Sequence, residues 1–170
     1  INEAIKRGKF ILEKNLINNS QLDSEILMSH VVNKDRKFVI LNSKKELDEK
    51  KLNYFYNLIF ERSKGKPIAY LTYKKNFWKY EFRVEKDILI PRPDTEILVE
   101  QALKITRNKS KLRVLDIGIG SGCILLSILK EKKNFYGVGI DISQKCINIS
   151  KTNAYNLSII NRLKLFNSCI

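Results

Sequence analysis

A glycine-rich turn in the second half of the chain constrains the fold more than any other feature. Three glycines stand at alternate positions, directly after a short apolar run, in Val114-Leu115-Asp116-Ile117-Gly118-Ile119-Gly120-Ser121-Gly122-Cys123. Glycine lets the main chain turn sharply and approach a ligand where a Cβ would collide. The apolar residues that follow, from Ile124 to Leu129, indicate a helix. The segment therefore predicts a strand, a tight turn and a helix.

The same alternation continues to the end of the sequence. We expect strands over residues 113–117, 136–140 and 162–166, with a helix that Ser143 caps before the last strand. Alternating strands and helices predict an α/β fold with a Rossmann-like, doubly wound parallel sheet, whose ligand crevice lies at the carboxyl ends of the strands. Such a sheet normally has about five or six strands. We therefore expect an incomplete domain, truncated at its C-terminus.

An acidic residue follows the second expected strand. Asp141 stands 21 residues after Gly120, and a carboxylate at that strand end can accept hydrogen bonds from both hydroxyls of a ribose. A glycine turn alone could simply connect a strand to a helix. Together with Asp141 and the buried strand before it, the turn predicts a nucleoside ligand.

The rest of the chain divides at residues 75 and 90. Residues 1–75 show short amphipathic helical patterns and predict a small bundle, in which Ser43 and Glu46 form a capping box for the third helix. Residues 76–90 are aromatic and β-branched and predict a β-hairpin linker with its turn near 85–87. Residues 91–170 hold the expected sheet domain, and Asp94 is the expected cap of its first helix.

Composition excludes several classes of protein. The three cysteines are widely spaced and there is one histidine, which predicts neither a disulfide framework nor a metal site and fits the cytoplasm. No apolar run approaches the length of a membrane span. The net charge of +14 is divided evenly along the chain. Residues 1–87 carry 19 Lys and Arg against 12 Asp and Glu, a net charge of +7, which is half of the total. An even spread does not predict a docking face for specific nucleic-acid binding.

The order D-x-G-x-G-x-G, which begins at Asp116, resembles the first motif of class I methyltransferases that bind S-adenosylmethionine. A dinucleotide fingerprint would have Gly or Ala where Cys123 stands. Asp116 would repel a pyrophosphate, whereas it favours a ligand with an ammonium and a sulfonium. The methyl donor is therefore the better candidate for this turn.

The flanking segments resemble one family of these enzymes. Ile88-Leu89-Ile90-Pro91-Arg92-Pro93-Asp94-Thr95-Glu96 is similar to the I-P-R-P-[DE]-T-E signature of the HemK family, the protein-(glutamine N5) methyltransferases of peptide chain release factors. Four further segments also resemble that family, and they are Leu22-Asp23-Ser24-Glu25-Ile26-Leu27, Gly65-Lys66-Pro67-Ile68-Ala69-Tyr70-Leu71, Phe77-Trp78 and Asn153-Ala154. The resemblance covers nearly the whole chain in the right order.

The resemblance implies a role for each part. The helical domain would recognise the substrate, and the sheet domain would bind S-adenosylmethionine. The cofactor residues would be Gly118, Ile119, Gly120, Ser121, Gly122 and Asp116 at the loop, Asp141 at the ribose and Cys169 near the adenine. Ser168 and Cys169 depart from the family's usual acid and aromatic pair. Pro91, Arg92 and Pro93 would shape the substrate pocket, although Arg92 could equally fix the linker through a salt bridge.

The resemblance also implies the reaction, which is methylation of the glutamine in the Gly-Gly-Gln motif of release factors. The family's catalytic Asn-Pro-Pro-Tyr tetrapeptide does not occur in this sequence, so no catalytic residue is assigned and the segment by itself is expected to be inactive. Two other functions stay open. One is an adenine N6-methyltransferase of nucleic acid, and the other is a noncatalytic module that binds the donor or a translation factor.

Overall fold

The protein is described by a computed structural model of residues 1–169. The chain forms two compact units, one over Ile1–Thr72 and one that begins at Tyr73. Each unit has its own hydrophobic core.

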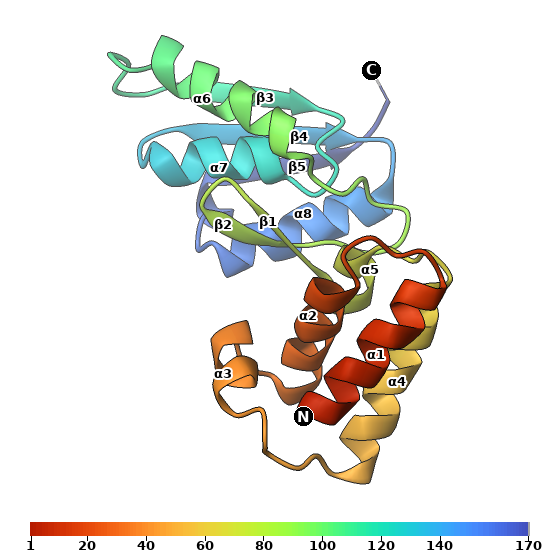
Figure 1. Cartoon of the computed structure of the whole chain (residues 1–170). Coiled ribbons are helices and arrows are strands. Elements are labelled where there is room, and N and C mark those ends of the chain that lie inside the picture. The colour runs from red at the N-terminus through yellow and green to blue at the C-terminus, as the bar shows by residue number, and fades with distance from the viewer. Residues whose placement is uncertain (170) are drawn as a thin grey trace. The chain divides into compact units, whose positions relative to one another are not determined.

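The first unit is entirely helical, as the sequence predicts (Figure 1). Its helices are α1 (Asn2–Lys14), α2 (Ser20–Val32), α3 (Arg36–Leu41), α4 (Glu49–Ser63) and α5 (Ile68–Thr72). Their apolar faces enclose a core in which Leu12, Leu27 and Phe55 are fully buried. The capping box at Ser43 and Glu46 is wrong. Helix α4 begins at Glu49, where the Asp48 carboxylate accepts a hydrogen bond from the Lys51 main-chain N–H at 2.8 Å.

Two carboxylates of α2 hold the helical unit together. Asp23 accepts a hydrogen bond from the Arg62 guanidinium of α4 at 2.7 Å, and both side chains are largely buried. Glu25, which is also buried, pairs with Arg36 at the start of α3. A buried carboxylate needs such a partner to offset its lost hydration. Asp23 and Glu25 therefore stabilise the helical unit.

The second unit opens with a two-stranded antiparallel hairpin, β1 (Lys74–Phe77) and β2 (Tyr80–Arg83). Phe77 lies opposite Tyr80, so the turn consists of Trp78 and Lys79. The hairpin turn is therefore not near residues 85–87 as predicted, although a separate turn does lie there, closed by a hydrogen bond from the Ile88 N–H to the Glu85 carbonyl at 3.0 Å. Phe77 and Phe82 are buried in the core of this unit, with their rings edge-to-face at 6.1 Å. The hairpin thus packs with the sheet that follows it.

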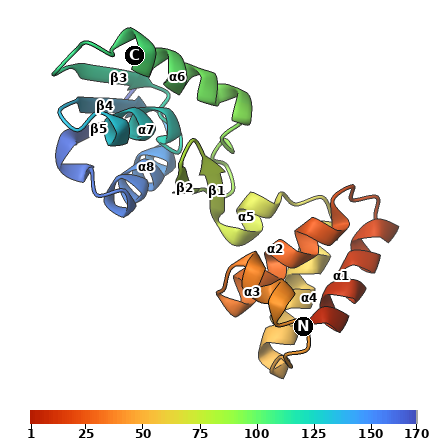
Figure 2. The same cartoon turned by 60° about the vertical axis from the view of Figure 1, so that its left-hand side comes forward.

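A parallel sheet forms the rest of the second unit, and its three expected strands are confirmed (Figures 1 and 2). The strands β3 (Arg113–Ile117), β4 (Tyr136–Asp141) and β5 (Leu163–Asn167) lie in the order β3-β4-β5. The helices are α6 (Glu96–Ile105), α7 (Cys123–Glu131) and α8 (Gln144–Asn156), and two 3₁₀ turns occupy Pro93–Thr95 and Ile160–Arg162. Asp94 lies within the first 3₁₀ turn and makes no capping hydrogen bond to α6, so that prediction is also wrong.

The strand order places α7 and α8 on one face of the sheet. Both crossovers run in the same direction, and right-handed crossovers in one direction put their helices on the same side (Figure 2). Val114 and Gly137 face these helices, whereas Leu115 and Ile117 are more than half exposed. The carboxyl ends of all three strands meet at one edge, where the glycine turn begins.

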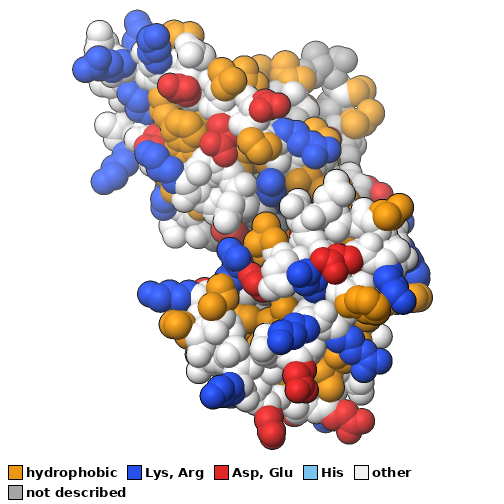
Figure 3. All heavy atoms as spheres, in the orientation of Figure 1, with side chains coloured by type: hydrophobic (Ala, Val, Ile, Leu, Met, Phe, Trp, Pro, Cys, Tyr) orange, Lys and Arg blue, Asp and Glu red, His pale blue; other side chains and the backbone are white. Residues whose placement is uncertain are grey.

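Charge is distributed unevenly over the visible surface of the second unit. On the face shown in Figure 3, Lys and Arg gather where α6 ends and β3 begins. Exposed Arg107, Lys109, Lys111 and Arg113 occupy this stretch. These cations lie at the amino ends of the strands, opposite the glycine turn. Within residues 1–169, no helix is long and apolar enough to cross a membrane.

Candidate functional site

The glycine turn between β3 and α7 has a left-handed main chain at three positions. Gly118, Gly120 and Gly122 have φ values of 76°, 56° and 82°. The three differ in what surrounds them. A Cβ on Gly118 would meet nothing within 4 Å, and one on Gly120 would meet only a main-chain oxygen at 4.0 Å. A Cβ on Gly122 would lie 2.8 Å from Leu126. The first two glycines therefore border open space, and the third permits close packing against α7.

Main-chain and apolar contacts anchor this turn to β4. The N–H groups of Gly118 and Ile119 both donate to the Ile140 carbonyl, at 2.8 and 3.0 Å. The Ile119 side chain is buried over Gly139, where an added Cβ would lie 2.3 Å from its Cδ1 atom. Glycine at position 139 thus makes room for Ile119 to pack on the sheet. The turn is fixed at its start by β4.

Asp141 ends β4 and connects the glycine turn to the next loop. One carboxylate oxygen accepts a hydrogen bond from the Gly120 N–H at 2.9 Å, and the other accepts from the Ser143 N–H at 2.9 Å. The residue is 9% exposed. A carboxylate offers about four acceptor positions. Two of these positions order the site, and the carboxylate has further acceptor capacity beyond them.

A hollow of ≈ 290 Å³ lies at the carboxyl ends of the strands. Its lining residues come from the ends of β3, β4 and β5 and are Ile117, Gly118, Ile140, Asp141, Ile142, Ser168 and Cys169. The structure thus brings together Gly118, Asp141 and Cys169, three of the residues expected at the cofactor. Isoleucines and a cysteine suit a flat apolar group, and the carboxylate suits hydroxyls. The hollow is therefore the candidate nucleoside site.

Asp116, at the end of β3, adds a second carboxylate beside the glycine turn. Burial raises its pKa above the usual aspartate range, and the nearby charge of Asp141 raises this pKa further. Asp116 is not among the residues that line the hollow. An ionised Asp116 would gain from a cationic ligand next to the turn, because opposite charge offsets its lost hydration.

Other predicted residues lie outside the hollow. Ser121 is buried within the turn. Pro91 is buried, while Arg92 and Pro93 are exposed in the segment before α6. Arg92 takes part in none of the ion pairs among the described residues, which does not support a salt bridge that fixes the linker. None of the three residues lines the hollow, so their place at a substrate pocket stays a prediction.

Sequence reasoning assigned no role at the site to two residues that shape it. Asn153 of α8 is fully buried and bonds to the turn through the Ser121 carbonyl. Gly139 accommodates Ile119, as described above. Glycine inside a strand signals close approach of another group, so Gly139 could have been recognised. Asn153 stood out only through the family resemblance.

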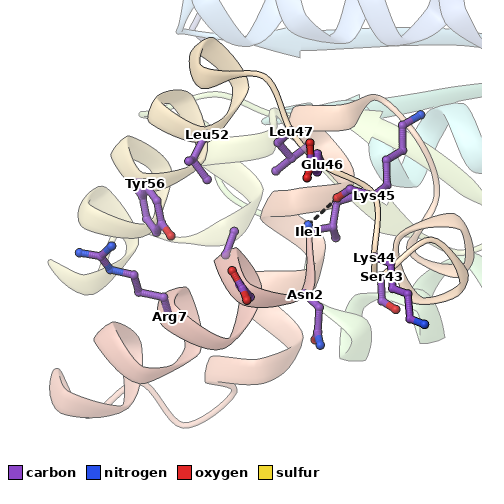
Figure 4. A pocket seen from close by; sticks show the side chains of 12 residues that line it. Ile1, Asn2, Arg7, Ser43, Lys44, Lys45, Glu46, Leu47, Leu52 and Tyr56 are labelled. Carbon is purple, nitrogen blue, oxygen red and sulfur yellow. Dashed lines mark hydrogen bonds between the residues drawn. The ribbon is translucent and has the colours of Figure 1, made fainter.

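A larger hollow, of ≈ 680 Å³, lies in the helical unit (Figure 4). It is bordered by the start of α1, the loop around Lys45 and the side chains of Leu52 and Tyr56 on α4. The Ile1 main-chain nitrogen donates a hydrogen bond to the Lys45 carbonyl across one side of it, at 2.7 Å. Its mixed Lys, Arg and Glu lining has no glycine turn and no strand ends. The smaller hollow is therefore the candidate cofactor site.

The parallel sheet, the D-x-G-x-G-x-G turn and an acid ending the second strand are the features of the class I methyltransferase domain. Comparison with known proteins shows which families the two parts of the chain are similar to. Residues 3–72 match the family model of the PrmC N-terminal domain. Residues 92–161 match the model of the methionine biosynthesis protein MetW.

Curated relatives agree with the first of these matches. The chain is 43% identical to the release factor glutamine methyltransferase of Clostridium acetobutylicum, over 85% of this chain and 51% of that protein. It is 40% identical to the enzyme of the same name from Buchnera aphidicola subsp. Acyrthosiphon pisum, over 90% of this chain and 55% of that protein. These matches support the HemK/PrmC family for this chain, which spans about half the length of these relatives.

Proposed function

We propose that the protein, in its full length, transfers a methyl group from S-adenosylmethionine to the glutamine side-chain amide in the Gly-Gly-Gln motif of peptide chain release factors. The observation that carries the proposal is the hollow where Gly118, Asp141 and Cys169 meet at the carboxyl ends of β3 to β5. The names of the relatives and the Ile88–Glu96 signature support the choice of acceptor.

The residues present fit the cofactor. The space beside Gly118 and Gly120 is open, so a ligand can approach the main chain there. Asp141 keeps acceptor positions for the two ribose hydroxyls, and Cys169 and Ile142 offer apolar surface for the adenine. Asp116 supplies negative charge near the turn. When bound, the cofactor supplies an electrophilic methyl group on a sulfonium.

The chain's own residues would bind and orient the two reactants, and the proton that the amide nitrogen loses on methylation would pass to water. An amide nitrogen is a poor nucleophile, because its lone pair is delocalised into the carbonyl. Positioning two reactants in line can supply a large part of the rate acceleration. We assign to Pro91, Arg92 and Pro93 the wall that faces the glutamine, and to the helical unit the recognition of the release factor.

The basic cluster at Arg107–Arg113 does not favour a nucleic-acid acceptor. It lies at the amino ends of the strands, whereas the hollow lies at their carboxyl ends. A nucleic acid bound to the cluster would be at the wrong edge of the sheet for the transfer. Methylation of adenine N6 in a nucleic acid is therefore not a second proposal, and the test below includes it as a possible outcome.

The test is a transfer assay with methyl-labelled S-adenosylmethionine and the full-length protein. Acceptors are a release factor, the same factor with its Gly-Gly-Gln glutamine replaced by alanine, and double-stranded DNA. We expect label only on the unaltered release factor. Equal labelling of the altered factor would refute the proposed acceptor residue, and labelling of DNA alone would refute the acceptor class.

A further inference from the structure

The side-chain amide of Asn153 connects three elements of the second unit. Its Nδ2 group donates to the Ser121 carbonyl in the glycine turn at 2.8 Å and to the Arg83 carbonyl of β2 at 3.0 Å. Its Oδ1 atom accepts the Arg83 main-chain N–H at 2.7 Å. The side chain is fully buried in α8. Both donors of the amide are thus used on main-chain groups far away in the sequence.

Asn153 bonds the turn where its main chain has the greatest conformational freedom. Ser121 lies between Gly120 and Gly122, the residues whose main chain has the greatest freedom. Ordering such a segment costs conformational entropy, which a ligand must otherwise supply on binding. A hydrogen bond to the Ser121 carbonyl restricts both flanking glycines at once.

A second contact from the same helix face supports the turn. A Cβ on Gly122 would lie 3.2 Å from the Cβ of Ser150, which stands three residues before Asn153 on α8. Ser150 is also fully buried. Residues three apart lie on one face of a helix. Helix α8 therefore holds the glycine turn at two adjacent points, one by packing and one by a hydrogen bond.

We infer that Asn153 is a positioning residue for the cofactor. It preorders the Gly118–Gly122 turn before the ligand arrives and ties this turn to the β1–β2 hairpin. The inference rests on the proposed function, since it concerns the cofactor of the same site. Asn153 itself is not among the residues that line the hollow, so its effect on affinity passes through the turn.

The experiment measures binding of S-adenosylhomocysteine to the full-length protein by titration calorimetry. Asn153→Ala removes all three hydrogen bonds, and Asn153→Asp keeps the shape but loses both donors. We expect each variant to bind at least tenfold more weakly. Asn153→Ser removes less of the buried side chain and keeps one donor, so we expect a smaller loss and a variant that folds if the others do not.

Leu157→Ala is the matched control, because Leu157 is a buried core residue at the end of the same helix. We expect it to lower Tm like Asn153→Ala but to change the dissociation constant less than twofold. Hydrogen exchange gives an independent readout. Without ligand, the amides of Gly120 and Gly122 should exchange faster in Asn153→Ala, and those of β5 should not.

The outcomes separate the two claims. No binding by the unaltered protein would refute the proposed cofactor. Tight binding by the unaltered protein and by the folded Asn153 variants would refute the role of Asn153 alone. If Leu157→Ala weakens binding as much as Asn153→Ala at equal Tm, Asn153 contributes only to stability and the inference is overturned.

Discussion

Replacing Asp141 by alanine should weaken both the fold and the cofactor site. The carboxylate accepts the Gly120 and Ser143 N–H groups, each at 2.9 Å, and Asp141→Ala leaves both without this acceptor. Hydrogen bonds to a charged group contribute roughly 1.5–3 kcal/mol each. At the lower end of this range for each bond, the loss in stability should be about 3 kcal/mol, which lowers Tm by about 6–12 °C for a domain of this size.

The effect on affinity comes from the further acceptor capacity of Asp141. Two lost ribose hydrogen bonds of about 1.5 kcal/mol each predict S-adenosylmethionine binding that is about a hundredfold weaker. Asp141→Asn should lose less affinity, because its oxygen still accepts one hydroxyl proton. It should also lose about half as much stability, since that oxygen can keep one of the two N–H groups.

Calorimetric titration and thermal unfolding of the full-length protein measure the two effects separately. Binding of a release factor to Asp141→Ala should hardly change below its Tm, because we assign that contact to the helical unit. If Asp141→Ala bound the cofactor like the unaltered protein, the ribose would not lie at the end of β4. An unchanged Tm would contradict the ordering role of the carboxylate.

Two further predictions concern charges near the glycine turn and the far end of α7. Burial raises the pKa of Asp116 above that of an ordinary aspartate. The ionised carboxylate therefore destabilises the fold once the pH is above the ordinary aspartate pKa. Asp116→Asn should raise Tm at pH 7 but not below about pH 4. The same change should weaken cofactor binding, and a Tm gain that persists at the lower pH would contradict the burial argument. The Arg162 guanidinium donates to the carbonyls of Leu129, Lys132 and Phe135 at the end of α7. Arg162→Leu should lower the free energy of unfolding by about 3 kcal/mol in a urea titration. It should leave cofactor affinity unchanged, and a loss of affinity would show that this end of α7 does affect the site.

The sheet could be predicted because its signals are local. Strand β3 matches the expected range of residues, and the Ser143 cap on α8 is confirmed by a hydrogen bond from the Cys146 N–H to the Ser143 hydroxyl. A glycine turn after an apolar run and a serine before a helix both act through neighbours in the sequence. Such features need no knowledge of the tertiary structure.

The hairpin turn could not be predicted, because distant residues determine it. Trp78 has a φ of 57° with no glycine or asparagine to signal it. Its main-chain N–H donates to Glu96 at 2.8 Å, and its indole N–H donates to Glu131 at 3.0 Å. Tyr80 also donates to Glu131, and burial together with this hydrogen bond raises the pKa of this tyrosine to about 12. These contacts from α6 and α7 stabilise a turn that its own sequence disfavours.

The candidate site could be predicted only in part, because some of its contacts join residues that are distant in the sequence. Gly118 and Asp141 belong to a local pattern and do meet at one hollow. The different surroundings of Gly118 and Gly122, one open and one packed on α7, are visible only in three dimensions. The bond from Asn153 to Ser121 spans 32 residues and has no sequence signature of its own.

A structure of the full-length protein with S-adenosylhomocysteine tests the central claim most directly. The account predicts the ligand in the hollow at the ends of β3, β4 and β5, with both ribose hydroxyls within hydrogen-bond distance of Asp141 and the amino-acid part beside Gly118 and Gly120. The adenine should contact Cys169 and Ile142. A ligand bound in the hollow of the helical unit, beside Lys45 and Tyr56, or one whose ribose lies away from Asp141, would contradict it.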